Sequence, residues 1–248
     1  MIDRDIERLR YDNRANLLLD SNQLKHNEKI PKYINPPYKH YFKLLKMQYN
    51  QSNLLEIGAG MGENTSLLVD MLYKVCSTDL SLKSVEVMTK RFSNRVNFSA
   101  EVADMEKLPF DDESFDIVCS AGSLSYGDNE LVMNEIYRVL KKGGVIVIVD
   151  SLNNSFIYQL NRYVHYLKGN RSKSTLTRIP TISLIDKYTE KFGYSKVKYF
   201  GSIAWIFPFL SKILNEQTIT NISNWVDSRF NIKKSAFKFV MLAIKNEK

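Results

Sequence analysis

The chain has 248 residues, of which 44% are hydrophobic and 25% charged, and its formal net charge is +8. This composition is typical of a folded globular protein and excludes a collagen, a coiled coil or a disordered tail as the main architecture. The excess of basic residues favours an anionic partner, such as nucleic acid, a membrane surface or a phosphorylated substrate.

Helical spacing in the first part of the chain predicts an N-terminal helical cap over residues 1–50. No apolar signal-peptide segment is visible there, and the apolar stretch 203–210 is too short to span a bilayer. Cys76 and Cys119 lie in apolar runs and are expected to be buried thiols. Together these features predict a cytoplasmic protein.

From residue 51 to the end we expect one α/β domain. Short β-rich runs at 54–57, 75–78, 96–99, 117–120 and 145–149 alternate with helical patterns at 63–72, 81–92 and 129–140. This alternation predicts βαβ units and a parallel sheet. Gly143 and Gly144 are expected to end the third helix and start the next strand.

A polar and basic segment at 151–180 is expected to be an insert that faces the substrate. A helix within it carries one apolar face, expected to pack on the body, with polar residues opposite. The apolar residues are Phe156, Leu160, Tyr163 and Leu167, and the polar ones include Asn161, Arg162 and His165. A helix at 181–192 and strands at 196–200 and 237–244 complete the pattern.

A glycine-rich turn, Gly58-Ala59-Gly60-Met61-Gly62, follows the first buried strand and opens a helix. Such a turn lets the backbone approach a ligand at the carboxyl end of the sheet. Glu63 stands where the dinucleotide fingerprint needs its third glycine, and the Lys-Ser/Thr pair of a phosphate loop is missing. The turn therefore predicts a nucleotide-like ligand, but it lacks the residues that would bind a pyrophosphate.

Two acids follow the next two strands. Asp79 ends the second strand and is able to accept hydrogen bonds from both hydroxyls of a ribose. The alternative is a helix cap, for which Ser81 is the better candidate. Asp104 follows the third strand and is able to accept from an adenine amino group, with Met105 near the ring; the alternative is an ordinary loop acid.

With the run 109–121, these motifs resemble class I S-adenosylmethionine-dependent methyltransferases, especially the type 11 branch that includes ubiquinone and menaquinone methyltransferases. The resemblance covers residues 52–150. It implies a doubly wound, Rossmann-like α/β fold with a seven-stranded, mostly parallel sheet whose last strand is antiparallel. It also implies S-adenosyl-L-methionine as cofactor and S-adenosyl-L-homocysteine as product. The cofactor-binding residues that it implies are Glu56, Gly58, Ala59, Gly60, Asp79, Leu80, Asp104, Met105, Ser120 and Ala121.

Candidates for catalysis come from outside this run. Members of the family that the sequence resembles often have a histidine after the fourth strand. Residues 122–126 stand at that position here and contain no histidine, so the resemblance implies no catalytic base there. A hydroxyl acceptor needs a base, and His165 and His40 are candidates, the alternative being structural or solvated histidines. Tyr11 and Arg14 are able to reach the cofactor carboxylate if the first helix closes the site.

Arg162, Arg171 and Arg178 form either a solvated face or a rim that docks a phosphate or diphosphate. The segment 160–176 is similar to methyltransferases of bacterial surface-polysaccharide biosynthesis, which implies a sugar hydroxyl, on a nucleotide-sugar or glycan, as acceptor. The alternative is a quinone, lipid or other small molecule, with 205–210 either touching a membrane surface or packing in the core.

Nucleic acid is not expected as a partner, and an RNA methyltransferase is the weaker alternative, because no RNA-binding module is visible. The letters Asn-Pro-Pro-Tyr occur at 35–38, ahead of the glycine-rich turn and not at the end of a strand. A protein that holds cofactor without turnover is a further alternative. No metal site is predicted, and the sequence does not fix the oligomeric state.

Overall fold

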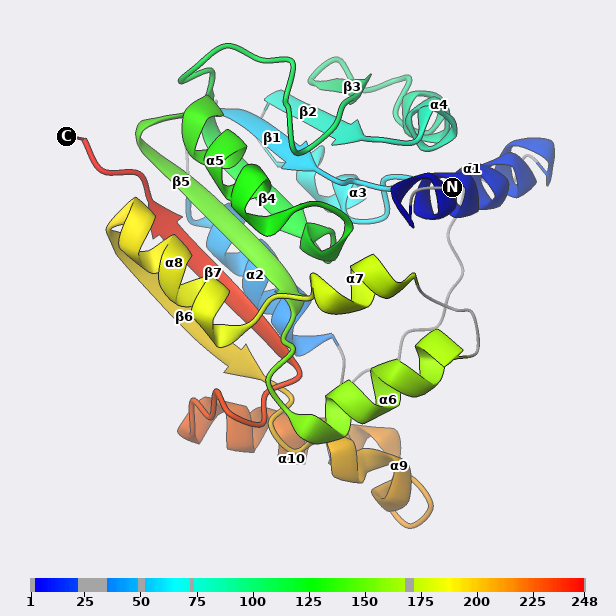
Figure 1. Cartoon of the computed structure of the whole chain (residues 1–248), viewed down its shortest axis with the longest axis vertical. Coiled ribbons are helices and arrows are strands. Elements are labelled where there is room, and N and C mark those ends of the chain that lie inside the picture. The colour runs from blue at the N-terminus through cyan, green and yellow to red at the C-terminus, as the bar shows by residue number, and fades with distance from the viewer. Residues whose placement is uncertain (1–2, 22–34, 49–51, 72–73, 168–171, 248) are drawn as a thin grey trace.

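A computed structural model describes residues 3–21, 35–48, 52–71, 74–167 and 172–247. Its centre is a seven-stranded sheet with the strand order β3-β2-β1-β4-β5-β7-β6 (Figure 1). The strands are β1 (Asn53–Ile57), β2 (Lys74–Asp79), β3 (Phe98–Val102), β4 (Phe115–Ala121), β5 (Leu140–Ser151), β6 (Tyr194–Phe200) and β7 (Lys238–Ile244). The central strands are apolar runs because both faces of the sheet are covered.

The chain winds outward from β1 in two directions, since β1 pairs in parallel with both β2 and β4. β3 continues the sheet on one side and β5 on the other. β7 is antiparallel to its neighbours β5 and β6. The doubly wound α/β class predicted from the sequence is thereby confirmed, including the mostly parallel sheet and the antiparallel last strand.

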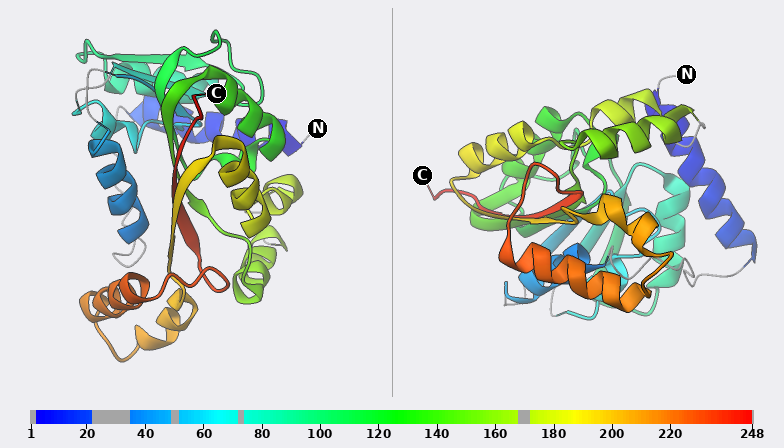
Figure 2. Two further views of the ribbon diagram at one scale, coloured as in Figure 1. Left: turned by 90° about the vertical axis from the view of Figure 1, so that its left-hand side faces the viewer. Right: turned by 90° about the horizontal axis from the view of Figure 1, so that it is seen from below.

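Helices cover both faces of the sheet (Figure 2). They are α1 (Asp3–Ser21), α2 (Pro36–Lys46), α3 (Thr65–Leu68), α4 (Leu82–Arg91), α5 (Asn129–Val139), α6 (Phe156–Leu167), α7 (Lys173–Thr177), α8 (Ile182–Phe192), α9 (Phe207–Leu210) and α10 (Glu216–Arg229), with short 3-10 helices η2 (Leu124–Tyr126) and η3 (Ala204–Ile206). On one face Ile136 of α5 and Tyr188 of α8 join a buried apolar cluster. On the other face Tyr41 of α2 and Met88 of α4 join a second cluster.

Several strand boundaries differ from the expected runs, and those of β3 and β5 affect the strand pairing. β3 begins at Phe98, opposite Val75 of β2, and the preceding Val96 is fully exposed and outside the ladder. β5 begins directly after α5, so that Gly143 and Gly144 lie inside the strand and not ahead of it. A register shift between β4 and β5 accompanies this early start.

The two N-terminal helices have different surroundings. α2 packs against β5 and β7, and its Tyr41 and Leu45 are fully buried in the core. α1 packs beside α4 instead (Figure 1). The Glu7 carboxylate of α1 accepts hydrogen bonds from the Ser172 backbone N–H and the Thr175 hydroxyl, each at 3.1 Å. Within the segment 1–50, α2 therefore belongs to a covering layer, and α1 is tied to α7.

The orientation predicted for the helix at 156–167 is wrong. Phe156 and Leu160 of α6 are 75% and 54% exposed, whereas Tyr158 and Arg162 are buried. The Arg162 guanidinium donates to the Leu152 carbonyl at 2.9 Å and lies 5.5 Å from the centroid of the Phe237 ring. Polar groups of the connection after β5 thus hold the polar side of α6 inward, and its apolar side faces outward.

Cys119 is buried in β4, as expected, and Cys76 in β2 is partly exposed; both are free thiols. In the 203–210 segment, Phe207 is fully buried, but Trp205 and Phe209 are exposed. None of the helices formed by the described residues combines the length and the apolarity that crossing a membrane requires.

Candidate cofactor and acceptor site

A cavity of about 440 Å³ lies at the carboxyl ends of β1, β2 and β4, with α1 as one wall. This is the point where the winding of the sheet changes direction, and the volume is in the range of small-molecule sites. Most residues that the sequence predicted for cofactor binding line this first cavity: Tyr11, Gly58, Ala59, Gly60, Asp79, Leu80, Asp104, Met105 and Ala121.

The turn after β1 brings bare backbone to the first cavity because two glycines adopt left-handed conformations. Gly58 has φ +61° and Gly60 has φ +59°. A Cβ on Gly58 would lie 2.4 Å from the Cβ of Ser123, so no side chain fits there. A Cβ on Gly60 would point into the space between Tyr11 and Glu63, whose nearest atoms are at 3.9 and 3.6 Å. That space is consequently left for a ligand.

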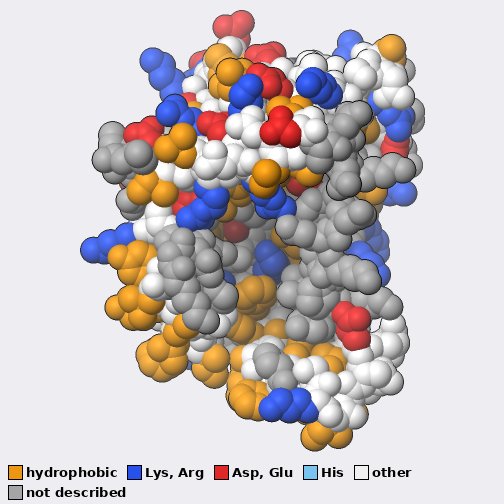
Figure 3. Space-filling view, turned by 90° about the vertical axis from the view of Figure 1, so that its right-hand side faces the viewer, with side chains coloured by type: hydrophobic (Ala, Val, Ile, Leu, Met, Phe, Trp, Pro, Cys, Tyr) orange, Lys and Arg blue, Asp and Glu red, His pale blue; other side chains and the backbone are white. Residues whose placement is uncertain are grey.

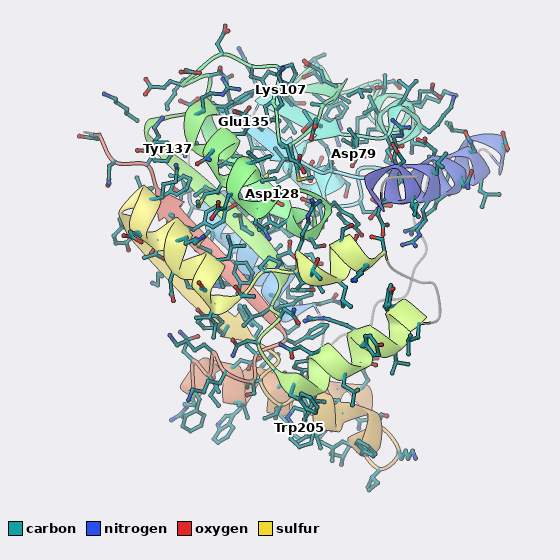
Figure 4. The ribbon with its side chains drawn as sticks, in the orientation of Figure 1. Asp79, Lys107, Asp128, Glu135, Tyr137 and Trp205 are labelled. Carbon is teal, nitrogen blue, oxygen red and sulfur yellow. The ribbon has the colours of Figure 1, made fainter. Side chains whose placement is uncertain are left out.

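Asp79 ends β2 beside α1 and carries a carboxylate held by two backbone donors (Figure 4). Its Oδ2 accepts from the Gly60 N–H at 2.8 Å and its Oδ1 from the Ser81 N–H at 2.9 Å. Ser81 caps α4 through Ser84, as expected, so the cap does not need Asp79. Burial raises the pKa of Asp79, and the two backbone hydrogen bonds oppose that effect. A carboxylate has about four acceptor sites, so both oxygens retain capacity toward a ligand.

Glu56 lies behind the turn and does not line the first cavity. Its Oε2 accepts hydrogen bonds from the Thr65 hydroxyl at 2.5 Å and the Ser77 hydroxyl at 2.7 Å. Burial raises the pKa of Glu56 to about 7, although the hydrogen bonds from Thr65 and Ser77 lower it. Glu56 therefore joins β1, β2 and the start of α3, and positions the turn from behind.

The ends of β3 and β4 complete the floor of the first cavity. Asp104 and Met105 line it after β3, and Ala121 lines it after β4. Ser120 is buried behind the lining, and its hydroxyl lies 2.7 Å from that of Ser123. Ser123, in the segment after β4, also lines the first cavity, and its hydroxyl donates to the Ile57 carbonyl at 3.1 Å.

Two tyrosines close the first cavity from the side of α1. The Tyr11 hydroxyl donates to the Tyr126 hydroxyl at 3.1 Å, and the two rings meet edge to face. Burial raises the pKa of Tyr11 well above its usual range, so the phenol stays protonated. Arg8 and Arg14 of α1 also line the cavity. Sequence reasoning did not find Tyr126, because a short 3-10 helix carries no periodic signal.

A second cavity of about 330 Å³ lies at the end of β6 and the start of β7. Its lining is mainly apolar and consists of Pro36, Pro37, Ile157, Tyr158, Phe200, Gly201, Ala204, Trp205 and Phe237, with Asn161, Asp227 and Lys238 as polar members. The Asp227 carboxylate is engaged within the fold, accepting from the Gly201 N–H at 2.8 Å and the Ser202 hydroxyl at 3.1 Å. The second cavity therefore offers apolar walls and the buried ammonium of Lys238.

The two cavities are neighbours at Tyr38 and Lys238. Tyr38 lines the first cavity and Lys238 the second, and the Lys238 ammonium donates to the Tyr38 hydroxyl at 3.3 Å. Lys238 also influences the buried Asp150 carboxyl. Burial raises the pKa of Asp150, and the positive charge of Lys238 lowers it. The segment 35–38 is the wall shared by both cavities. The sequence did not indicate this role, because the Asn-Pro-Pro-Tyr letters precede the glycine-rich turn and end no strand.

Of the remaining sequence candidates that the structure describes, His40, Arg162 and Arg178 are in neither lining. His40 is half-buried on α2, and burial together with nearby lysines lowers its pKa. Arg162 is a buried residue on the inner side of α6, and Arg178 directly follows α7. The side chain of His165 and the whole of Arg171 lie outside the described residues.

Comparison with known proteins identifies the part of the chain that builds most of the first cavity. A family model described as a methyltransferase domain, of the type 11 branch expected from the sequence, matches residues 55–148. The match covers less than half of the chain. The matched segment comprises the turn after β1, both acids at the strand ends and β4.

Two curated relatives share this domain. The chain is 35% identical over 108 residues to a malonyl-[acyl-carrier protein] O-methyltransferase of Marinomonas sp., a match that covers 42% of this chain and 40% of the relative. It is 28% identical over 163 residues to a sterol 4-C-methyltransferase of Caenorhabditis elegans, covering 61% of this chain and 48% of the relative. The chain therefore spans less than half the length of these two proteins.

The fold is also that of solved methyltransferases. The chain superposes on a geranyl diphosphate C-methyltransferase of Streptomyces coelicolor with a TM-score of 0.59, covering 90% of this chain and 86% of that one at 16% identity. That enzyme was crystallised with S-adenosyl-L-homocysteine, geranyl diphosphate and Mg²⁺. The likeness confirms the Rossmann-like methyltransferase fold.

Proposed function

We propose that this chain is an S-adenosylmethionine-dependent methyltransferase that acts on a small, largely apolar acceptor. The observation that carries the proposal is the pair of acids Asp79 and Asp104, which follow adjacent strands and face one cavity across a bare glycine turn. The family match of residues 55–148 supports the same activity.

The first cavity fits the cofactor in the chemistry of its lining. Its charged residues are Glu7, Glu63, Asp79 and Asp104, together with Arg8 and Arg14. Carboxylates suit the ribose hydroxyls, the adenine amino group, the ammonium and the cationic sulfur, and a guanidinium suits the cofactor's carboxylate. The open space beside Gly60 provides the close approach to backbone that the elongated ligand needs.

Bound S-adenosylmethionine supplies a methyl group that is electrophilic because it is attached to a cationic sulfur. The protein has to hold a nucleophilic atom in line with that methyl, at near-attack distance. Asp79 and the glycine turn would hold the ribose, and Tyr11 and Tyr126 would cover it from the side of α1. Tyr38 and Lys238, at the junction of the cavities, orient the acceptor from the other side.

The second cavity is where we place the body of the acceptor. Its walls are apolar, and Lys238 provides a buried positive charge for a polar or anionic head group. The sterol named for one similar enzyme is a largely apolar molecule, and the geranyl diphosphate named for the other joins an apolar chain to an anionic head group. A sugar hydroxyl on a nucleotide-sugar or glycan stays a prediction, and this lining supports the quinone, lipid or other small-molecule alternative better.

A two-part experiment tests the proposal. Calorimetry with S-adenosylhomocysteine measures cofactor binding, and labelled S-adenosylmethionine reports methyl transfer to panels of quinone precursors, prenyl diphosphates, nucleotide-sugars and RNA. We expect cofactor binding and turnover on an apolar acceptor. Absence of cofactor binding contradicts the proposed activity. Turnover on a nucleotide-sugar or RNA alone would contradict only the acceptor class.

A further inference from the structure

An apolar stripe runs along the outward side of α6. Its members follow the spacing of one helical face and are Phe156, Leu160, Tyr163, Val164 and Leu167, all exposed. Trp205, Phe209 and Ile213, on and after η3 and α9, are exposed as well, and Phe209 is 67% accessible. Figure 3 shows hydrophobic side chains gathered over the lower half of this side of the molecule. We call these eight residues the apolar face.

The outward direction of the stripe is fixed by hydrogen bonds on the inner side of α6. The Tyr158 hydroxyl donates to the Gly201 carbonyl at 2.8 Å, which ties α6 to the segment ahead of η3. The Arg162 guanidinium donates to the Leu152 carbonyl at 2.9 Å and to the Asn153 side chain at 3.2 Å. Turning the helix over would bury the stripe but would leave these polar groups without their hydrogen-bond partners. The apolar face therefore stays exposed in the folded chain.

The charged residues in the segments that carry the apolar face are basic. The described parts of 151–178 and 201–215 include the exposed Lys173 and Lys212 and the partly buried Arg178, and these parts contain no Asp or Glu. An amphipathic helix with basic surroundings is the combination that binds the surface of an anionic bilayer. A second copy of this chain suits the face less well, because a two-fold contact would bring the same basic segments together on two chains of net charge +8.

The apolar face is continuous with the second cavity. Trp205 of the face also lines that cavity, and Ile157 is both exposed and part of its lining. Trp205 lies at the lower end of the molecule, near α6 and α9 (Figure 4). A molecule dissolved in a bilayer under the face would reach the cavity past these two side chains.

We propose that α6 and residues 203–213 dock this protein on the surface of an anionic phospholipid bilayer, with the mouth of the second cavity toward the lipid. The docking itself is independent of methyl transfer. The entry of an apolar acceptor from the bilayer rests on the function proposed above.

Vesicle flotation of the full chain tests the docking. The probes are vesicles of phosphatidylcholine alone and of an equimolar mixture of phosphatidylcholine and phosphatidylglycerol. We expect binding to the mixed vesicles that weakens with salt, and weaker binding to phosphatidylcholine. The double variant Phe156→Ser/Leu160→Ser should bind the mixed vesicles about tenfold less or weaker, since large apolar side chains no longer enter the lipid.

Leu131→Ser is the matched control, because Leu131 is 49% exposed on α5 and outside the apolar face, against 54% for Leu160. It should bind vesicles like the unaltered chain. Failure to bind mixed vesicles, or equal binding by the double variant, overturns the proposal. A concentration-dependent dimer in sedimentation that the double variant abolishes would assign the face to a second copy instead. Calorimetry with S-adenosylhomocysteine on each variant separates these outcomes from failure of the proposed activity.

Discussion

Replacing Asp79 by asparagine should weaken cofactor binding about 10- to 100-fold. The carboxylate is oriented by the Gly60 and Ser81 backbone amides at 2.8 and 2.9 Å, so its remaining acceptor capacity faces the first cavity. A hydrogen bond to a charged acceptor contributes about 1.5–3 kcal/mol, and each 1.4 kcal/mol is about tenfold in affinity. Asparagine keeps the shape of the side chain but removes its charge and one acceptor.

Asp116→Asn is the control, because the Asp116 carboxylate also accepts a backbone N–H, that of Asn53 at 2.9 Å, but at the amino end of β1. Calorimetry with S-adenosylhomocysteine should show unchanged affinity there. An analogue without the ribose hydroxyls should bind the unaltered chain less tightly, and Asp79→Asn should discriminate less between the two ligands. Unaltered affinity in Asp79→Asn, or equal loss in both variants, would refute the role given to Asp79.

Three further outcomes follow from buried groups. Gly58→Ala should lower the free energy of unfolding more than Gly122→Ala, because both glycines have positive φ but only the first new Cβ would lie within 3 Å of another side chain; thermal unfolding measures the difference. Burial raises the pKa of Glu56 from 4.5 to about 7, so its neutral form is favoured in the folded state. Stability should therefore fall by about 3 kcal/mol as pH rises through that window, and Glu56→Gln should remove this fall in urea unfolding at several pH values. Lys238→Met should destabilise the chain in the same assay, because it removes a buried cation whose charge favours the ionised form of buried Asp150, whereas Lys238→Arg should retain most of the stability.

The residues of the first cavity could be predicted from the sequence because short local motifs identify them. Gly58, Gly60, Asp79 and Asp104 all lie at or within a few residues of the carboxyl end of a strand, and parallel strands bring these ends to one edge. Each residue therefore needs only its own neighbours to be placed. Glu56 is the exception, since its position on the strand indicates the site but only the hydroxyls of other elements show that it points away from the cavity.

Long-range contacts and helix orientation were not predictable in this way. Tyr38 and Lys238 are 200 positions apart, and no local pattern indicates that they meet. The period of α6 correctly identifies an apolar stripe, but it does not specify which side faces the body. That choice depends on carbonyl and amide groups near 152 and 153, which satisfy Arg162.

The family model matches most of the residues that line the first cavity but none of those that line the second. The similar proteins are therefore more informative about the cofactor than about the acceptor. The family match ends at residue 148 and starts at residue 55. Every residue that lines the second cavity lies outside those limits, in the segments 36–37, 157–161, 200–205, 227 and 237–238. The two curated relatives are matched over less than half of their own length. If the acceptor occupies the second cavity as proposed, the N-terminal segment, α6 and the β6–β7 region decide the acceptor class, and variants there should change the choice of acceptor while leaving cofactor affinity intact.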